Sequence, residues 1–163
     1  MNTQGELTVR RATFEDPRDI GELATLRFAW RARERGEQSM SESEFTSAFA
    51  LWLREHRESH VGFIGSLGTE PVAMAWLALV DRVPGPGVFE RRCAYVQSVF
   101  VTAHYRSAGY GSAIMSVLID DARELRLDYL AVHPSAESFN FYRRLGFEET
   151  NSVLELDFRS DRA

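Results

Sequence analysis

The sequence contains no lysine, so arginine and histidine are its cationic side chains. Without lysine, no side chain can form a Schiff base with a carbonyl substrate. The phosphate loop of nucleotide hydrolases, which needs Gly-Lys-Ser or Gly-Lys-Thr, is also excluded. Cys93 is the sole cysteine, which excludes an internal disulfide and a cysteine-based zinc site. We therefore predict no metal site, and we interpret Cys93 as a small residue of a strand.

Long apolar runs and concentrated positive charge are missing as well. No stretch approaches the roughly 20 apolar residues of a membrane span. Residues 1–6 have neither a basic start nor an apolar run, so we expect a cytoplasmic protein without a membrane partner. The net charge of −5 argues against a general nucleic-acid binder, because pairs such as Arg91-Arg92 are too few to bind phosphates. An acidic surface instead favours a cationic partner such as an amine.

What is present is an ordinary globular composition, 44% hydrophobic and 26% charged over 163 residues. This length fits one domain, residues 1–163, with a substantial core. Strand patterns at residues 7–12, 60–66 and 71–80 mix with helical patterns at residues 17–35 and 41–58. The two apolar strands around residues 67–70 predict an antiparallel hairpin, and a long loop should follow over residues 81–92.

The stretch from Tyr95 to Gly111 is the centre of the chain. A strand through Val99-Phe100-Val101 breaks near Thr102 and passes two glycines into a helical pattern over residues 109–124. A strand that turns into a helix N-terminus gathers unpaired amides and a positive dipole end, which favours a phosphate group. Gly109 and Gly111 would let a pyrophosphate approach these amides closely. A dinucleotide fingerprint is excluded, because Ile114 stands where it needs a third glycine.

The segment after the strand resembles the cofactor motif of the GCN5-related N-acetyltransferases, in which Arg or Gln is followed by two residues, Gly, any residue, and Gly or Ala. Here it reads Arg106-Ser107-Ala108-Gly109-Tyr110-Gly111. A second segment, Phe141-Tyr142-Arg143-Arg144-Leu145-Gly146-Phe147, is similar to a later motif of that family. The family's usual asparagine falls at Ser135 and its usual small residue at Ser138.

The resemblance implies a single-domain α/β (α+β) fold of the acyl-CoA N-acyltransferase type. This would be a mixed sheet of six to seven strands flanked by about four helices. A strand over residues 127–132 should pair in parallel with the central strand, a short helix should follow over residues 135–147, and residues 148–158 should form one or two closing strands.

The resemblance also implies how acetyl-CoA is held. The backbone of Val99 and Val101 would pair with the pantetheine arm, with an amide near Phe100 or Val101 facing the thioester carbonyl. The loop and helix start would cradle the diphosphate, and the two serines would meet the pantetheine or adenosine side. The implied cofactor residues are Val99, Phe100, Val101, Arg106, Ser107, Ala108, Gly109, Tyr110, Gly111, Ser112, Ser135 and Ser138.

The proton-transfer groups are less well determined. Tyr142 would donate a proton to the departing thiolate, since a phenol is neutral at pH 7. Many members carry glutamate where this chain has Gln97, and an amide cannot accept the proton that the amine loses. Gln97 would then orient a water or the acceptor. The base would be His133 or Glu34, or no protein base would be needed because the amine arrives deprotonated.

The leading hypothesis is transfer of an acetyl group from acetyl-CoA to a primary amine of a small molecule. In this family the first helices cover the acceptor, so Phe28, Trp30, Glu34 and Trp76 are expected to line that pocket. A protein or peptide acetyltransferase and a coenzyme A sensor without turnover remain alternatives. A homodimer is a family expectation.

Overall fold

The computed structural model describes residues 5–37, 39–150 and 153–159. The chain divides into two compact units, Met1–His133 and Pro134–Ala163. The single domain over residues 1–163 stays a prediction. In the described part of the chain, no helix has the length and apolar character that crossing a bilayer requires.

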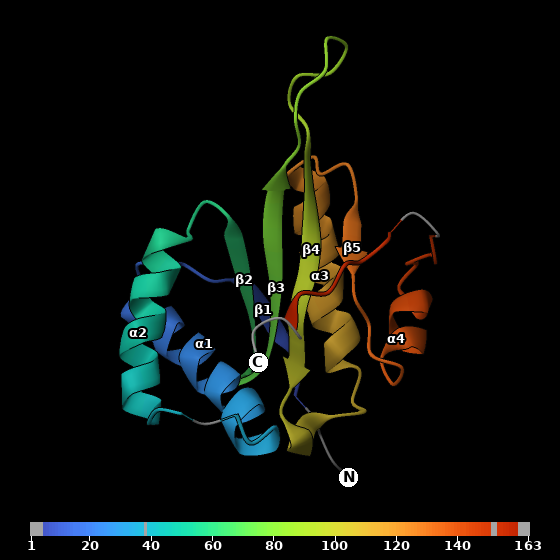
Figure 1. Cartoon of the computed structure of the whole chain (residues 1–163). Coiled ribbons are helices and arrows are strands. Elements are labelled where there is room, and N and C mark those ends of the chain that lie inside the picture. The colour runs from blue at the N-terminus through green and yellow to red at the C-terminus, as the bar shows by residue number, and fades with distance from the viewer. Residues whose placement is uncertain (1–4, 38, 151–152, 160–163) are drawn as a thin grey trace. The chain divides into compact units, whose positions relative to one another are not determined.

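The first unit is built on one mixed sheet in the order β1-β2-β3-β4-β5 (Figure 1). Neighbouring strands are antiparallel except β4 and β5, which are parallel. The strand bounds are β1 Thr8–Arg11, β2 His60–Leu67, β3 Glu70–Asp81, β4 Arg92–Val101 and β5 Leu130–Val132. The predicted hairpin is confirmed as β2 and β3, whose turn contains Gly68 with a φ of +59°.

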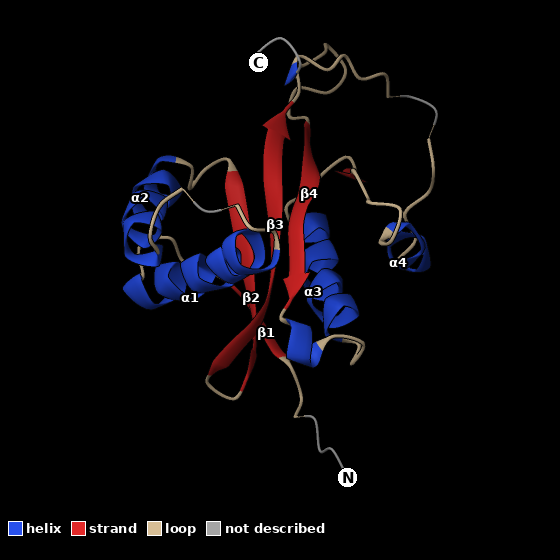
Figure 2. Cartoon of the chain, turned by 60° about the horizontal axis from the view of Figure 1, so that its bottom comes forward, coloured by secondary structure: helices blue, strands red, loops and turns tan. Residues whose placement is uncertain are grey.

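Helices cover both faces of this sheet. α1 (Pro17–Phe28) and α2 (Glu42–Glu55) lie on one face, and α3 (Tyr110–Glu124) lies on the other (Figure 2). Central strands with two covered faces should be apolar throughout, and Val72–Leu77 of β3 are all buried. The core between α1, α2 and the sheet contains Phe14, Ile20, Leu23, Leu26, Leu53, Ile64, Met74, Trp76 and Phe100.

Both α1 and α2 begin at a side-chain cap. Asp16 accepts a bond from the amide of Arg18, with Pro17 at the first helical position. Ser41 and Glu44 form a capping box at the start of α2. The first helix differs from its predicted course, since Ala29–Glu34 form a π-helix, η1, after α1. Its wider turns are seen where the amide of Arg35 donates to the carbonyl of Trp30 at 3.2 Å.

The long loop between β3 and β4 is confirmed, and Figure 1 shows it projecting beyond the strands. It precedes Arg92, whereas the glycine-containing loop follows Val101, so the two loops lie at opposite ends of β4. Val83 and Phe89 in the long loop are 87% and 79% exposed.

The second unit contains the short helix α4 (Phe139–Arg144), which the sequence predicted within residues 135–147. The closing strands predicted over residues 148–158 are wrong, because the described residues in that range form no strand. Residues 151–152, within this predicted range, lie outside the described residues. The described sheet therefore has five strands and not six to seven. Leu154, Leu156 and Phe158 alternate with charged residues as in a strand, yet all three are exposed and pair with no described strand.

Candidate functional site

The end of β4 has an open edge. β4 pairs with β5 over three residues, Ala94, Tyr95 and Val96. From Gln97 to Val101, β4 pairs with β3 on one side and with no other strand in the described part of the chain. The backbone groups on the second side are therefore available to an extended ligand.

A β-bulge determines which groups face this edge. Trp76 pairs with Gln97 and Met74 with Phe100, so β4 has one more residue than β3 between these pairs. Ser98 in the bulge has a φ of +54°. Beyond it, the amide of Thr102 donates to Val72 of β3 at 2.9 Å.

Because strand amides alternate in direction, the amides of Val99 and Val101 point away from β3. The resemblance assigned the pantetheine contacts to these same two residues. The carbonyl of Val101, on the same side, accepts a bond from Nε of Arg106 at 2.9 Å. The open edge thus begins at the bulge and ends at the loop that follows β4.

The loop after β4 leads into a helix start without a side-chain cap. A short 3₁₀ turn, η2 (Ala103–Tyr105), is followed by two left-handed residues, Ser107 with φ +63° and Gly109 with φ +85°. Gly109 is the N-cap of α3, and its carbonyl accepts the bond from the amide of Ala113 at 3.0 Å.

The amides of Tyr110, Gly111 and Ser112 consequently have no carbonyl one turn before them within α3. A Cβ built on Gly109 would meet no protein atom within 4 Å, so the space above this helix start is open. Amides, dipole and clearance together fit the diphosphate of coenzyme A. The predicted cofactor loop therefore has the backbone geometry that its role requires.

Arg106 is held between three groups. Its Nη2 pairs with Oε2 of Glu34 at 2.6 Å, and its guanidinium carbon lies 5.6 Å from the ring centroid of Phe100. With the bond to the carbonyl of Val101, these contacts tie η1 to the end of β4. Arg106 thus supports the edge of the cofactor site, and its direct contact with the cofactor stays a prediction.

A cavity of about 430 Å³ lies beside the bulge, on the face of the sheet that α1 and α2 cover. Aromatic rings form much of its wall: Phe45 and Phe49 stack with centroids 5.2 Å apart, and Phe49 and Trp52 stack at 6.0 Å. This is a suitable size for a small ligand next to the central strand. Its lining comprises Arg27, Met40, Phe45, Ala48, Phe49, Trp52, His60, Trp76, Gln97 and Ser98.

The four predicted acceptor residues separate in the structure. Trp76 lines this cavity, and Phe28 lines an adjoining one of about 510 Å³. Trp30 and Glu34 belong to the lining of neither. Trp30 stacks on Phe100 with centroids 5.7 Å apart. Both residues therefore brace the central strand rather than face the cavity.

His60 is a titratable residue of this wall that the sequence analysis missed. Its ring meets Trp52 edge-on with centroids 4.8 Å apart, and its Nδ1 lies 2.9 Å from Oγ of Ser59. Burial, followed by the nearby charge of His56, lowers the pKa of His60. The sequence signal was the spacing of Trp52, His56 and His60, which we interpreted separately as helix and strand residues.

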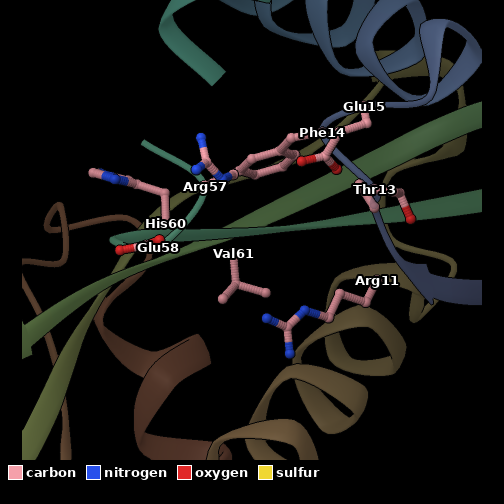
Figure 3. A pocket seen from close by; sticks show the side chains of 9 residues that line it. Arg11, Thr13, Phe14, Glu15, Arg57, Glu58, His60 and Val61 are labelled. Carbon is pink, nitrogen blue, oxygen red and sulfur yellow. The ribbon is translucent and has the colours of Figure 1, made fainter. Parts of the chain in front are cut away.

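A third cavity, of about 440 Å³, has a mixed, charge-balanced lining. Figure 3 shows Arg57, Glu58 and His60 on one side of it and Arg11 on the other. Phe14 and Glu15 from the segment before α1 also line it. None of its lining residues belongs to β4 or to the loop after it, so it is separate from the cofactor edge.

The predicted residues of the second unit are placed within α4 and the turn before it. Tyr142 is buried, with the rings of Phe141 and Phe147 at 5.1 and 5.5 Å, and burial raises the pKa of its phenol. The hydroxyl oxygens of Ser135 and Ser138 lie 3.0 Å from each other. Both serines therefore organise the turn that precedes α4.

His133, which follows β5 in the first unit, stacks on Tyr95 with centroids 5.9 Å apart. It is exposed and belongs to none of the three cavity linings, whereas Gln97 lines the cavity beside the bulge. Of the two predicted base or orienting residues, the structure brings Gln97 alone to this cavity.

Comparison with known proteins gives the same fold. A predicted acetyltransferase from Clostridium acetobutylicum, crystallised with acetyl-CoA, has a TM-score of 0.72 at 22% identity, covering 95% of this chain and 98% of its own. An acetyltransferase from Trypanosoma brucei has a TM-score of 0.69 at 22% identity, with coverages of 93% and 99%. Glucosamine-6-phosphate N-acetyltransferase from Arabidopsis thaliana has a TM-score of 0.69 at 14% identity, with coverages of 94% and 99%.

No curated protein matches the chain in sequence. The model of the acetyltransferase (GNAT) family, however, matches residues 23–147. This match includes β4, the loop before α3, and the motif around Tyr142. The chain therefore belongs to the GNAT acetyltransferase family.

Proposed function

We propose that this acetyltransferase moves an acetyl group from acetyl-CoA to the primary amine of a small molecule. The observation that carries the proposal is the open, bulged edge of β4, which runs into the uncapped start of α3. That edge offers strand-like bonding to a pantetheine arm, and the helix start offers amides to a diphosphate. The aromatic cavity of about 430 Å³ beside the bulge has the size of a small-molecule site, which supports a small acceptor over a protein or peptide.

In the proposed reaction the amine nitrogen bonds to the acyl carbon, and the bond from that carbon to sulfur breaks. The amine loses one proton and the departing thiolate gains one, so the products are an amide and the free thiol. Acetyl-CoA supplies the thioester. The amides of Val99 and Val101 hold the pantetheine arm, and one of them donates to the carbonyl oxygen as charge develops on it.

Tyr142 is the proposed acid. Burial raises the pKa of its phenol, so it keeps its proton at neutral pH and has one to give to a thiolate. The proposal requires its hydroxyl to reach the sulfur when cofactor is bound.

His60 is the proposed base, in preference to His133. It lines the acceptor cavity together with Gln97. Its lowered pKa leaves the imidazole neutral at pH 7 and able to accept the amine's proton. Gln97, whose amide cannot accept a proton, orients the amine or a water.

Thiol release from acetyl-CoA, measured across a panel of primary amines, tests this function. We expect release to depend on particular small amines, with the matching acetamide detected by mass spectrometry. Release with peptide amines alone would point to the alternative substrate class. Tight cofactor binding with no release for any amine would favour a sensor, an alternative that rests on the amide at Gln97. The cytoplasmic location and the homodimer stay predictions.

A further inference from the structure

Arg27 is a cation of the acceptor cavity without a counter-ion. It lies on α1, where its Nη1 donates to Oγ of Ser98 in the β4 bulge and its guanidinium carbon lies 5.4 Å from the ring centroid of Trp30. None of the ion pairs among the described residues includes Arg27. No carboxylate of the described chain therefore forms an ion pair with Arg27, although the charge of Glu37, which pairs with Arg31, acts on it from farther away.

Two arginines that follow Arg27 in the sequence, unlike Arg27, form ion pairs. Arg31 pairs with Glu37 at 2.6 Å, and Arg33 pairs with Glu42 at 2.7 Å. Arg27 is half-buried and lacks such a partner. Burial, reinforced by the charge of Arg31 and opposed by that of Glu37, lowers its pKa. A partly buried guanidinium without an anion is unfavourable, so its retention in a cavity wall indicates that a ligand supplies the missing negative charge.

The other residues of the cavity wall indicate which chemical groups the rest of that ligand contains. Phe45, Phe49 and Trp52 present stacked rings, which bind planar apolar groups well. Trp76 also lines the cavity, is 5% exposed, and its Nε1 has no acceptor among the described residues. The wall thus offers aromatic faces and unpaired donors.

We propose that the acceptor is an amine that also carries a carboxylate and an aromatic group, as an aromatic amino acid does. The carboxylate binds Arg27 and Ser98, the ring packs among Phe45, Phe49 and Trp52, and the amine faces Gln97. One unpaired guanidinium matches one negative charge, and the nearby Arg31 is already paired with Glu37, which favours a carboxylate over a phosphate. This inference rests on the proposed function, since it names the substrate class of the same site.

Calorimetric titration of the wild-type protein, with and without saturating coenzyme A, provides the test. Phenylalanine is compared with phenethylamine, which lacks the carboxylate, and with alanine, which lacks the ring. We expect phenylalanine to bind about 10- to 100-fold more tightly than phenethylamine, from the lost charged hydrogen bonds. It should bind at least about 10-fold more tightly than alanine, from the buried ring. Equal binding of phenylalanine and phenethylamine would overturn the inference.

Variants of Arg27 locate the effect. Arg27→Gln should remove the preference for phenylalanine over phenethylamine. Arg27→Lys should keep part of it, because lysine retains the positive charge but lacks the planar guanidinium that can donate two parallel hydrogen bonds. Arg18→Gln, an exposed position on the same helix that pairs with Glu22, is the matched control and should leave the preference unchanged. If the Arg27→Gln variant binds coenzyme A normally and keeps the preference, the inference is wrong.

Failure of this inference and failure of the proposed function give different results. If coenzyme A binds and neither carboxylate nor ring strengthens amine binding, the acceptor class is wrong while the function stands. If coenzyme A does not bind and phenylalanine still binds through Arg27, the inferred ligand class is right and the proposed acetyl transfer is wrong.

Discussion

Burial acts in opposite directions on the two groups that we propose to move protons. It raises the pKa of the Tyr142 phenol and lowers the pKa of the His60 imidazole. In both cases the neutral form is favoured, because an apolar environment penalises charge whatever its sign. At neutral pH the tyrosine is therefore protonated and can donate a proton, and the histidine is neutral and can accept one.

Replacing Tyr142 by Phe should lower kcat by about 10²- to 10⁴-fold, the usual contribution of a positioned acid. The ring remains, so its contacts with Phe141 and Phe147 are kept and the fold should persist. Steady-state thiol release measures kcat, and calorimetry checks that coenzyme A binding is unchanged. A variant with wild-type kcat would remove Tyr142 from the mechanism.

The His60 pKa predicts a pH profile. Activity should be constant near neutral pH and fall as the medium is acidified, with an apparent pKa below the ordinary 6.5, because burial and His56 lower it. His60→Gln should lower kcat/KM at pH 7 by about 10²-fold or more and flatten the acid limb.

His104→Gln is the matched control, since His104 is exposed in the turn η2 and outside the three cavity linings. An unchanged acid limb in His60→Gln would assign the proton to another group or to an amine that arrives deprotonated.

At the scale of elements, β4, its bulge and α3 together form the proposed cofactor site. The bulge turns the amides of Val99 and Val101 to the open side, and two left-handed residues lead the chain into the helix. Gly109 matters twice, because its φ of +85° suits glycine and its missing Cβ leaves the helix start clear.

Gly109→Ala should therefore do two things. The left-handed φ should cost about 1 to 2 kcal/mol of stability, and the new Cβ should weaken coenzyme A binding by about tenfold or more. Gly68→Ala is the matched control: Gly68 also has positive φ and open space around it, but it lies in the hairpin turn between β2 and β3.

Urea unfolding should show similar losses for the two variants, and calorimetry should show weaker binding in Gly109→Ala alone. Equal coenzyme A affinity in both variants would mean that no diphosphate approaches Gly109.

The sequence predicted best the elements whose local pattern and tertiary role agree. The apolar run of β3, the turn at Gly68, the capping box at Ser41 and the glycine-containing helix start at Gly109 were all recognisable. The π-helix at Ala29–Glu34 was missed because apolar spacing does not separate one helix type from another. The bulge at Ser98 was missed because it depends on the register between β3 and β4.

At the scale of the whole molecule, the same limit explains the missing strands and the missed side chains. Leu154, Leu156 and Phe158 alternate like strand residues, but a strand also needs a partner, and pairing is a tertiary property. Arg27 and His60 are far apart in sequence, and the packing of α1 and α2 on the sheet brings both into one cavity wall. Local pattern thus led to the proposed cofactor site, and the fold was needed to propose the acceptor site.

The central claim is that backbone amides at the end of β4 and the start of α3 hold the diphosphate and pantetheine of coenzyme A. Isothermal titration calorimetry of the purified, folded protein with coenzyme A tests it most directly. Pantetheine, which lacks the diphosphate, is the comparison ligand. The account predicts saturable binding of coenzyme A and much weaker binding of pantetheine. A folded protein that takes up no coenzyme A, or that binds pantetheine equally well, would contradict it.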